Sequence, residues 1–392
     1  MWDEIMASIH AEALDCLQAN LAVLADRWHG AGTHLRLGAA LGFAPQPATP
    51  LPTVDPGLAG RLTEAQELLG LVVRERYSRI QGPELCRLAA AGNPVYVVAD
   101  AHDLPWVPYY RRRRVEHSFL LTAGTGGWTV VDAYHNDTPW GQARPCVLRL
   151  DAPAIDAAVA DACALVLAPV QLPARVPARV PPPDPGEVAA YITAYRGHPE
   201  RAVAMDRLTV ETWLLARARR LHAAWTRSPA DAEHAASWSA LAEQVYLALR
   251  RVERGRPEPP GTLDRLSGLL LAEARPEARR PAAEPAMAAE PAMAAEPAMA
   301  AEPAMAAEPV RAAVLNAASR VLGVDREALA AGRSFVDIPT FSSFRLVDIL
   351  EQVELALGIE LPASELLPER LHDADTMSCL FFRHAQGASS HA

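Results

Sequence analysis

The sequence predicts an α+β protein of several domains, because strand signals and helix signals lie in different parts of the 392-residue chain. Short runs rich in β-branched and aromatic residues are confined to roughly the first 170 residues. Helical patterning dominates residues 186–280, and a third, helical region follows a repetitive segment. Half of all residues are apolar but only 6% are aromatic, and the abundant alanine favours helix.

Two compositional breaks divide the chain. Residues 171–185 are rich in proline, which cannot continue a helix or a central strand. In residues 281–309, Ala-Ala-Glu-Pro-Ala-Met is repeated four times and then begins a fifth time. Because proline at every sixth position stops a long helix, we expect a linker with a reach on the order of 80 Å. The breaks separate three predicted domains, at residues 1–170, 186–280 and 310–386.

The first domain is expected to begin with helices. One apolar face at helical spacing predicts a helix that ends near Gly30. A second helical stretch is expected from about Leu62 to Ile80. The face of the first helix consists of Leu14, Leu17, Leu21, Leu24 and Trp28.

Short strands follow in the same domain. The glycine-rich segment 124–127 lies between two of them and can adopt the positive φ angles of a tight turn. These two strands should therefore form an antiparallel hairpin. The predicted strands are residues 95–98, 117–122, 128–131 and 165–167.

Three side chains of this domain form a candidate nucleophilic site. Cys16 follows Asp15 at the start of the first helix, where the helix dipole should lower the pKa of its thiol. His117 opens one hairpin strand and Asp132 ends the next, so antiparallel pairing brings them together. An aspartate bound to one imidazole nitrogen leaves the other nitrogen to accept a thiol proton. The alternative is an inert buried cysteine and a histidine–aspartate pair that serves stability.

Four segments carry a resemblance to a known family. They are Asp-Cys-Leu-Gln-Ala-Asn-Leu at 15–21, Asp-Leu-Pro-Trp at 103–106, Glu-His-Ser-Phe-Leu-Leu at 116–121 and Val-Val-Asp-Ala-Tyr at 130–134. Together they resemble the papain-like N-terminal domain of the butirosin BtrH-type acyltransferases. The resemblance implies transfer of an acyl group from a carrier-protein thioester to an amine. It assigns Cys16 as nucleophile, His117 as base and then acid, and Asp132 as the residue that orients the imidazole.

Several details of this site stay open. Papain-like and related peptidases share the same order of cysteine, histidine and aspartate, so a thioesterase or peptidase is an alternative. No glutamine lies a few residues before Cys16, which leaves the Cys16 N–H and Gln18 as candidates for the oxyanion hole. A metal site is disfavoured, because its candidate ligands lack the spacing of zinc ligands. Those candidates are His10, Cys16, His102, His117 and His135.

The C-terminal domain contains a second candidate site. A helix is expected to begin near Ser343, and Gly-Ile-Glu-Leu-Pro follows at 358–362. Over residues 310–386 this arrangement resembles a four-helix acyl or peptidyl carrier protein. The resemblance implies that Ser343 carries covalent 4'-phosphopantetheine, attached by a phosphopantetheinyl transferase. The usual Gly-x-Asp-Ser-Leu is replaced by Thr-Phe-Ser-Ser-Phe at 340–344, so a simple helix N-cap at Ser343 and a carrier that only docks are alternatives.

A run of arginines precedes His117 in the sequence. Arg111 to Arg114 are consecutive, and the predicted C-terminal domain is acidic. The run is therefore suited to steering that domain or to holding a phosphate. An ordinary solvated loop is an equal alternative.

Composition excludes some classes of function. The net charge of −10 argues against binding nucleic acid. Five scattered cysteines without a Cys-x-x-Cys pair argue against a disulfide framework and favour a reducing compartment. Neither a signal peptide nor a membrane span is expected. We therefore expect a cytoplasmic protein without a membrane partner.

These inferences combine into one hypothesis, a carrier-dependent acyltransferase of natural-product biosynthesis. Its expected partners are an acyl-loading enzyme or other carrier proteins, and a small-molecule amine as acceptor. The rival hypothesis is a noncatalytic scaffold that recruits assembly-line proteins. The intact cysteine, histidine and aspartate favour the enzyme, whereas the altered serine motif favours the scaffold.

Overall fold

The structure, a computed structural model, has a mixed α+β fold. None of its described helices is long and apolar enough to cross a membrane. The chain forms two compact units, Met1–Val245 with Leu263–Arg280, and Tyr246–Thr262 with Pro281–Ala392. The described residues are 2–159, 161–172, 176, 178–274, 304–362, 371 and 373–389, so residues 281–303 of the predicted linker lie outside them.

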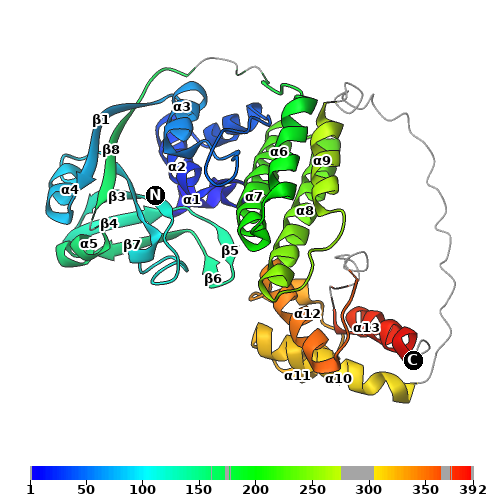
Figure 1. The fold of residues 1–392 in the computed structure, drawn as a ribbon. Coiled ribbons are helices and arrows are strands. Elements are labelled where there is room, and N and C mark those ends of the chain that lie inside the picture. Colours follow the sequence, from blue (N-terminus) through cyan, green and yellow to red (C-terminus); the bar gives the residue numbers. More distant parts are fainter. Residues whose placement is uncertain are drawn as a thin grey trace, which may run out of the picture. The chain divides into compact units, whose positions relative to one another are not determined.

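An antiparallel six-stranded sheet organises the first unit (Figure 1). Its strand order is β1-β8-β2-β3-β4-β7. Its strands are β1 (Leu71–Ile80), β2 (Val95–Asp100), β3 (Glu116–Gly124), β4 (Gly127–Asp132), β7 (Cys146–Leu150) and β8 (Ala162–Pro169). A separate pair consists of β5 (Asn136–Thr138) and β6 (Gly141–Ala143).

The four predicted strands are confirmed as parts of β2, β3, β4 and β8. The predicted hairpin joins β3 to β4, with Gly124 paired to Gly127. Gly126 has a φ of 81° in the turn, a conformation that side chains with a Cβ rarely adopt. The glycine pattern thus located this turn correctly.

The predicted helix from Leu62 to Ile80 is wrong in its second half. Helix α3 (Gly57–Leu69) ends at Gly70, whose φ of 63° reverses the chain in a left-handed C-cap. The residues that follow form β1, which pairs with β8 almost a hundred residues later in the chain. Val72, Val73 and Tyr77 fit such a strand, and pairing with β8 decides its conformation.

Helices cover both faces of the sheet. Helix α2 (Cys16–His29) packs its leucines against one face, in a core that includes Leu120 and Val131. Helices α4 (Gly82–Ala89) and α5 (Ala152–Ala158) cover the opposite face. Neighbouring strand residues alternate between the two cores, as the pleat of a strand requires.

The N-terminal end of α2 is fixed by its cap. The side chain of Asp15 accepts hydrogen bonds from the N–H groups of Leu17 and Gln18, and Gln18 completes a capping box. The helix ends at Gly30, as the sequence predicts. The short helix α1 (Trp2–Ser8) precedes it.

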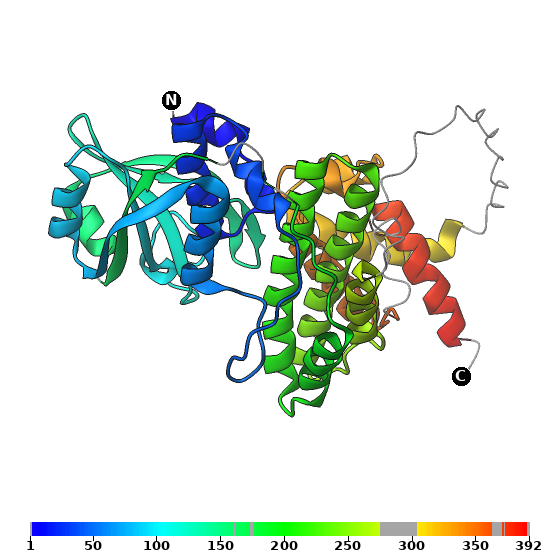
Figure 2. The same ribbon diagram turned by 90° about the horizontal axis from the view of Figure 1, so that it is seen from above.

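The described part of the predicted helical region, which reaches residue 274, is helical, but it is not a compact unit of its own. Up to Val245 it belongs to the same unit as the sheet, and Figure 2 shows its helices beside the sheet. His222 hydrogen-bonds the carbonyl of Gly38, where a Cβ would lie 2.4 Å from the carbonyl oxygen of Leu221. The proline-rich segment therefore connects two parts of one unit. The helices are α6 (Pro185–Gly197), α7 (Arg201–Thr226), α8 (Pro229–Glu253) and α9 (Thr262–Glu273).

The C-terminal helices of the second unit surround their own apolar core, which contains Val314, Leu350 and Phe381. The first helix begins at Ala304, so residues 304–309 of the predicted linker are helical instead. Alanine's high helix propensity explains this extension, which continues through Pro309 at the cost of one backbone hydrogen bond. The helices are α10 (Ala304–Leu322), α11 (Arg326–Ala330), α12 (Ser343–Leu357) and α13 (Ala374–Ser389).

Candidate active site

Cys16 is the first residue of α2, and it contacts the strand that carries His117. Its Sγ lies 3.4 Å from the carbonyl oxygen of Glu116. Its own carbonyl accepts a 2.5 Å hydrogen bond from the hydroxyl of Ser118. Because Glu116 and Ser118 flank His117 in β3, the N-terminus of α2 lies beside the segment of strand that carries this histidine.

His117 and Asp132 form a buried pair, with 2.7 Å between Nε2 and Oδ2. The register of β3 and β4 places Asp132 on the same face of the sheet as His117. The carboxylate also accepts hydrogen bonds from the Trp106 indole at 3.0 Å and the Tyr134 N–H at 3.0 Å. A carboxylate held in this way fixes the orientation of the imidazole and keeps a proton on Nε2.

The other imidazole nitrogen of His117 makes no hydrogen bond within the described part of the chain. Nδ1 is buried, and among the described residues none donates to it or accepts from it. A buried polar atom without a partner costs free energy, so such atoms are rare unless they serve a function. With the proton on Nε2, Nδ1 is a free acceptor.

The pKa of the Cys16 thiol is raised well above its usual value, which corrects the expected lowering. Burial is the largest cause, and the negative charges of Asp15 and Asp132 add to it. The positive charge of Arg217 acts in the opposite direction. The helix dipole acts on Cys16, but burial and the carboxylates outweigh it. Cys16 is therefore a neutral thiol at neutral pH.

Sequence reasoning missed Asn20, which connects all three elements of the site. Its side-chain amide donates to the Ser118 carbonyl at 2.8 Å and to the Ser118 hydroxyl at 3.1 Å. Its oxygen accepts from the N–H of Ala133 at 3.0 Å. Asn20 is fully buried one helical turn after Cys16. A polar residue among the leucines of this helix was the available signal. We call these bonds the Asn20 clamp.

Arg217, on α7, was also missed and belongs to the same site. Its buried guanidinium donates to the carbonyls of Ala11, Leu14 and His135 and stacks 4.2 Å from the centre of the Trp213 ring. Burial lowers the pKa of Arg217, and its charge favours ionisation of Cys16. No local sequence signal connects residues some 200 positions apart.

The predicted oxyanion-hole residues differ in their availability. The Gln18 side chain accepts from the N–H of Asp15 at 3.4 Å and donates to Glu64 at 3.1 Å, so it is used for capping and packing. The Cys16 N–H belongs to the first turn, where N–H groups have no partner within the helix. Cys16 is thus the better candidate donor. Asp15 itself pairs with Arg61 at 2.6 Å.

Ser343 is the first residue of α12, in the second unit. The N-cap of this helix is the preceding Ser342, whose buried hydroxyl accepts from the N–H of Arg345 at 3.3 Å. The alternative interpretation of Ser343 as the N-cap is therefore wrong. The cap leaves Ser343 in the first turn, at the positive end of the helix dipole.

Three residues of the arginine run have acidic partners within the first unit. Arg111 lies 3.5 Å from Asp103. Arg113 lies 3.1 Å from Asp206, and Arg114 lies 2.6 Å from Asp100. Much of the charge in this run is therefore compensated locally, which favours its interpretation as a solvated loop.

The five histidine and cysteine candidates do not make a metal centre in this structure. Across the described ranges, no three histidine, cysteine, aspartate or glutamate side chains are grouped so that they could hold a metal ion. Comparison of the chain with models of known protein families and with curated proteins finds no match.

The raised pKa of Cys16 predicts a characteristic alkylation profile. We expect iodoacetamide to modify Cys16 more slowly at pH 7.5 than the exposed Cys379, and its rate to keep rising above pH 9, because the thiolate fraction grows until the pH reaches the pKa. Asp55→Asn removes a nearby negative charge and should shift the profile to lower pH. Peptide mass spectrometry measures both rates. A plateau below pH 8 would contradict the neutral thiol.

The Asn20 clamp predicts a large effect of an isosteric substitution. Asn20→Asp places a carboxylate oxygen against the Ser118 carbonyl, and we expect a loss of about 3 kcal/mol in the free energy of unfolding. Urea denaturation measures this loss. Asn93→Asp, in an exposed turn, is the matched control and should change stability by less than about 0.5 kcal/mol. Equal effects at the two positions would rule out the clamp.

Proposed function

We propose that this chain is a cysteine acyltransferase that takes an acyl group from a thioester and transfers it to a small-molecule amine. In this proposal the N-terminal domain is papain-like and residues 310–386 are an acyl or peptidyl carrier domain. The observation that carries the proposal is the buried Nδ1 of His117, which has no hydrogen-bond partner among the described residues. Asp132 orients the ring of His117, and Cys16 contacts the carbonyl of the preceding residue, Glu116.

The first half of the reaction forms an acyl-enzyme. Cys16 gives its thiol proton to Nδ1 of His117 as Sγ attacks the thioester carbonyl. The C–S bond of the donor then breaks, and the leaving thiolate takes the proton from Nδ1. Asp132 stabilises the imidazolium that exists between these two transfers. Exchange between two thioesters costs little free energy, so the site must mainly generate and orient the thiolate.

The second half regenerates the enzyme. An amine attacks the acyl carbonyl on Sγ, and Nδ1 of His117 accepts a proton from its nitrogen. The bond to Sγ breaks, the amide leaves, and the proton returns to Cys16. The N–H of Cys16 is the candidate donor to the carbonyl oxygen in both halves. If water replaces the amine, the same residues catalyse hydrolysis, which is the competing outcome.

In this proposal the second unit carries the donor thioester on Ser343. Ser343 begins α12, where the helix N-terminus favours the negative phosphodiester of 4'-phosphopantetheine. Ser342 is buried and uses its hydroxyl for the cap, which favours its neighbour as the attachment residue. When bound, the group supplies a thiol that holds an acyl group as a thioester. A phosphopantetheinyl transferase and an acyl-loading enzyme or other carrier proteins would be the partners.

A covalent intermediate on Cys16 is the first expected outcome. Incubation with an acyl thioester of N-acetylcysteamine, without amine, should add the acyl mass to the Cys16 peptide, because Sγ is the nucleophile. Cys16→Ala should remove the label, and His117→Ala should slow acylation about a hundredfold or more. Asp132→Asn should cost less, because a hydrogen bond to the ring can persist.

Product analysis then separates the alternatives. With an amine present, intact mass spectrometry should detect the amide, whereas free acid alone would identify a hydrolase. Absence of label at Cys16, while Cys379 in the same sample reacts with a general thiol reagent, would favour the noncatalytic scaffold.

Modification of Ser343 is tested separately. Coexpression with a broad-specificity phosphopantetheinyl transferase should add the mass of the group to the peptide with Ser343, and Ser343→Ala should abolish it. Ser342→Ala is the matched control, which should weaken the helix by about 1 kcal/mol but keep the modification. An unmodified wild type beside a converted control carrier would identify a degenerate carrier domain.

A further inference from the structure

The C-terminal end of α8 carries a concentrated positive charge. Arginines occupy positions 250, 251, 254 and 256, with Glu253 the acidic residue among them. Arg250 and Arg254 are one helical turn apart, where like charges repel each other. We call these four residues the arginine cluster. Such a cluster is stable next to a surface that supplies negative charge.

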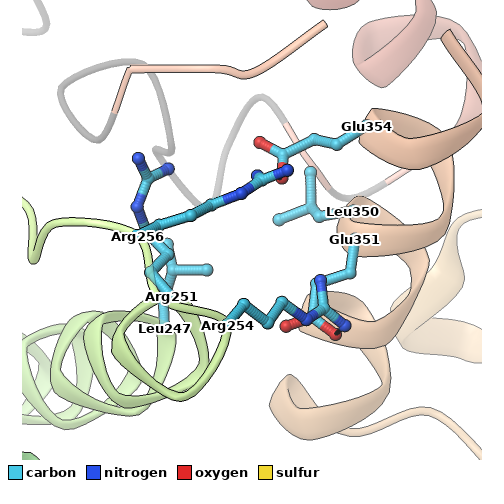
Figure 3. A pocket seen from close by; sticks show the side chains of 7 residues that line it. All are labelled: Leu247, Arg251, Arg254, Arg256, Leu350, Glu351 and Glu354. Atoms are coloured by element: carbon cyan, nitrogen blue, oxygen red, sulfur yellow. Dashed lines mark hydrogen bonds and ion pairs between the residues drawn. The ribbon is translucent and has the colours of Figure 1, made fainter. Parts of the chain in front are cut away.

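Helix α12 supplies that charge within the second unit (Figure 3). Glu351 is only 7% exposed, and its carboxylate accepts two hydrogen bonds from Arg250, at 3.2 and 3.1 Å, and another from Arg254. Around it, Glu354 lies 3.4 Å from Arg256. Glu360, just after the helix, pairs with Arg251, and Asp348 lies 3.9 Å from Arg250.

The same contact also has an apolar part, made of two leucines and one pair of aromatic rings. Leu247 and Leu350 line the pocket between the charged side chains, as Figure 3 shows. The rings of Tyr246 and Phe344 meet edge to face with 4.4 Å between their centres. Ion pairs join all four arginines to α12 or to Glu360 just after it, so this surface is rich in charge, in contrast to the leucine-rich contacts of a permanent helix interface.

We propose that the arginine cluster is a docking surface for α12, held by ion pairs, so that the four C-terminal helices alternate between a docked and a free form. Most of the paired groups are partly exposed, and salt screens such pairs strongly. Glu351, held by two guanidinium groups, is the anchor. The segment that binds this surface is the chain's own α12. The apolar core that α12 forms with α10 and α13 does not include the arginine cluster.

Docking also bears on Ser343, a consequence that rests on the proposed function. Phe344 follows Ser343 directly, and in the docked form Tyr246 covers its ring. A modifying enzyme that approaches over Phe344, Asp348 and Glu351 must displace the end of α8. Release of α12 should therefore speed modification of Ser343.

The test severs the covalent connection and measures the contact. A protease site inserted after Met293 in the repeat allows the purified full chain to be cut into two fragments. Size-exclusion chromatography and fluorescence anisotropy then measure their association. We expect the fragments to stay together in 50 mM NaCl and to separate in 1 M NaCl. Circular dichroism confirms that the C-terminal fragment remains helical.

Charge-reversed variants identify the surface. Arg250→Glu with Arg254→Glu should weaken association by about tenfold or more, because Glu351 then meets negative charge. Adding Glu351→Arg should restore much of the affinity. Arg265→Glu is the matched control. Arg265 hydrogen-bonds Gln244 on α8 and is not part of the arginine cluster, so this substitution should leave the affinity unchanged.

Each remaining outcome overturns the proposal. Wild-type fragments that separate in 50 mM NaCl show that no docking surface exists. Fragments that persist in 1 M NaCl, or despite both arginine substitutions, show that a different and permanent contact holds them. Because association is measured without modification of Ser343, this result is independent of the proposed activity. The consequence for Ser343 is tested apart from association: a faster modification rate in the double arginine variant supports it, and an unchanged rate overturns it.

Discussion

The geometry of the candidate site depends on one buried amide, the side chain of Asn20. It binds Ser118, the neighbour of His117, and Ala133, the neighbour of Asp132. Asn20 lies one turn after Cys16 in the same helix, so the position of Asn20 also fixes the position of Cys16. The amide of Asn20 is fully buried, and its donors and its acceptor all have partners. It fixes the positions of these residues more strongly than exposed pairs do, because no water can replace a partner that is lost.

The electrostatics of the site favour a neutral resting state. Burial and the nearby carboxylates keep the thiol of Cys16 protonated, while Arg217 partly offsets them. In the proposed reaction the thiolate then exists only while Nδ1 of His117 holds its proton. A thiol that is neutral at rest also reacts slowly with oxidants and stray electrophiles, because the thiolate is the reactive form. The same charges that oppose ionisation of Cys16 thereby protect its thiol from these side reactions.

Local patterns predicted much of the first unit, because helix faces, caps and glycine turns depend on neighbouring residues. They located α2, the hairpin, and the shared face of His117 and Asp132. Local patterns failed to predict the structure where residues far away in the sequence determine it. Strand β1 exists through its pairing with β8, and Arg217 reaches the carbonyl of Leu14 from another helix. The prediction of a low pKa for Cys16 was wrong for a similar reason. It considered only the dipole of the helix and not the burial of the thiol in the folded protein.

The two arginine-rich segments show why charge in a sequence does not identify a docking surface by itself. The run before His117 is the more conspicuous, yet three of its residues pair with Asp100, Asp103 and Asp206 in their own unit. The cluster at the end of α8 is interrupted and so is less conspicuous in the sequence, but its residues pair with the carboxylates of α12. A surface attracts a partner through the charge that remains after local pairing, and that remainder becomes known only when the fold specifies each neighbour.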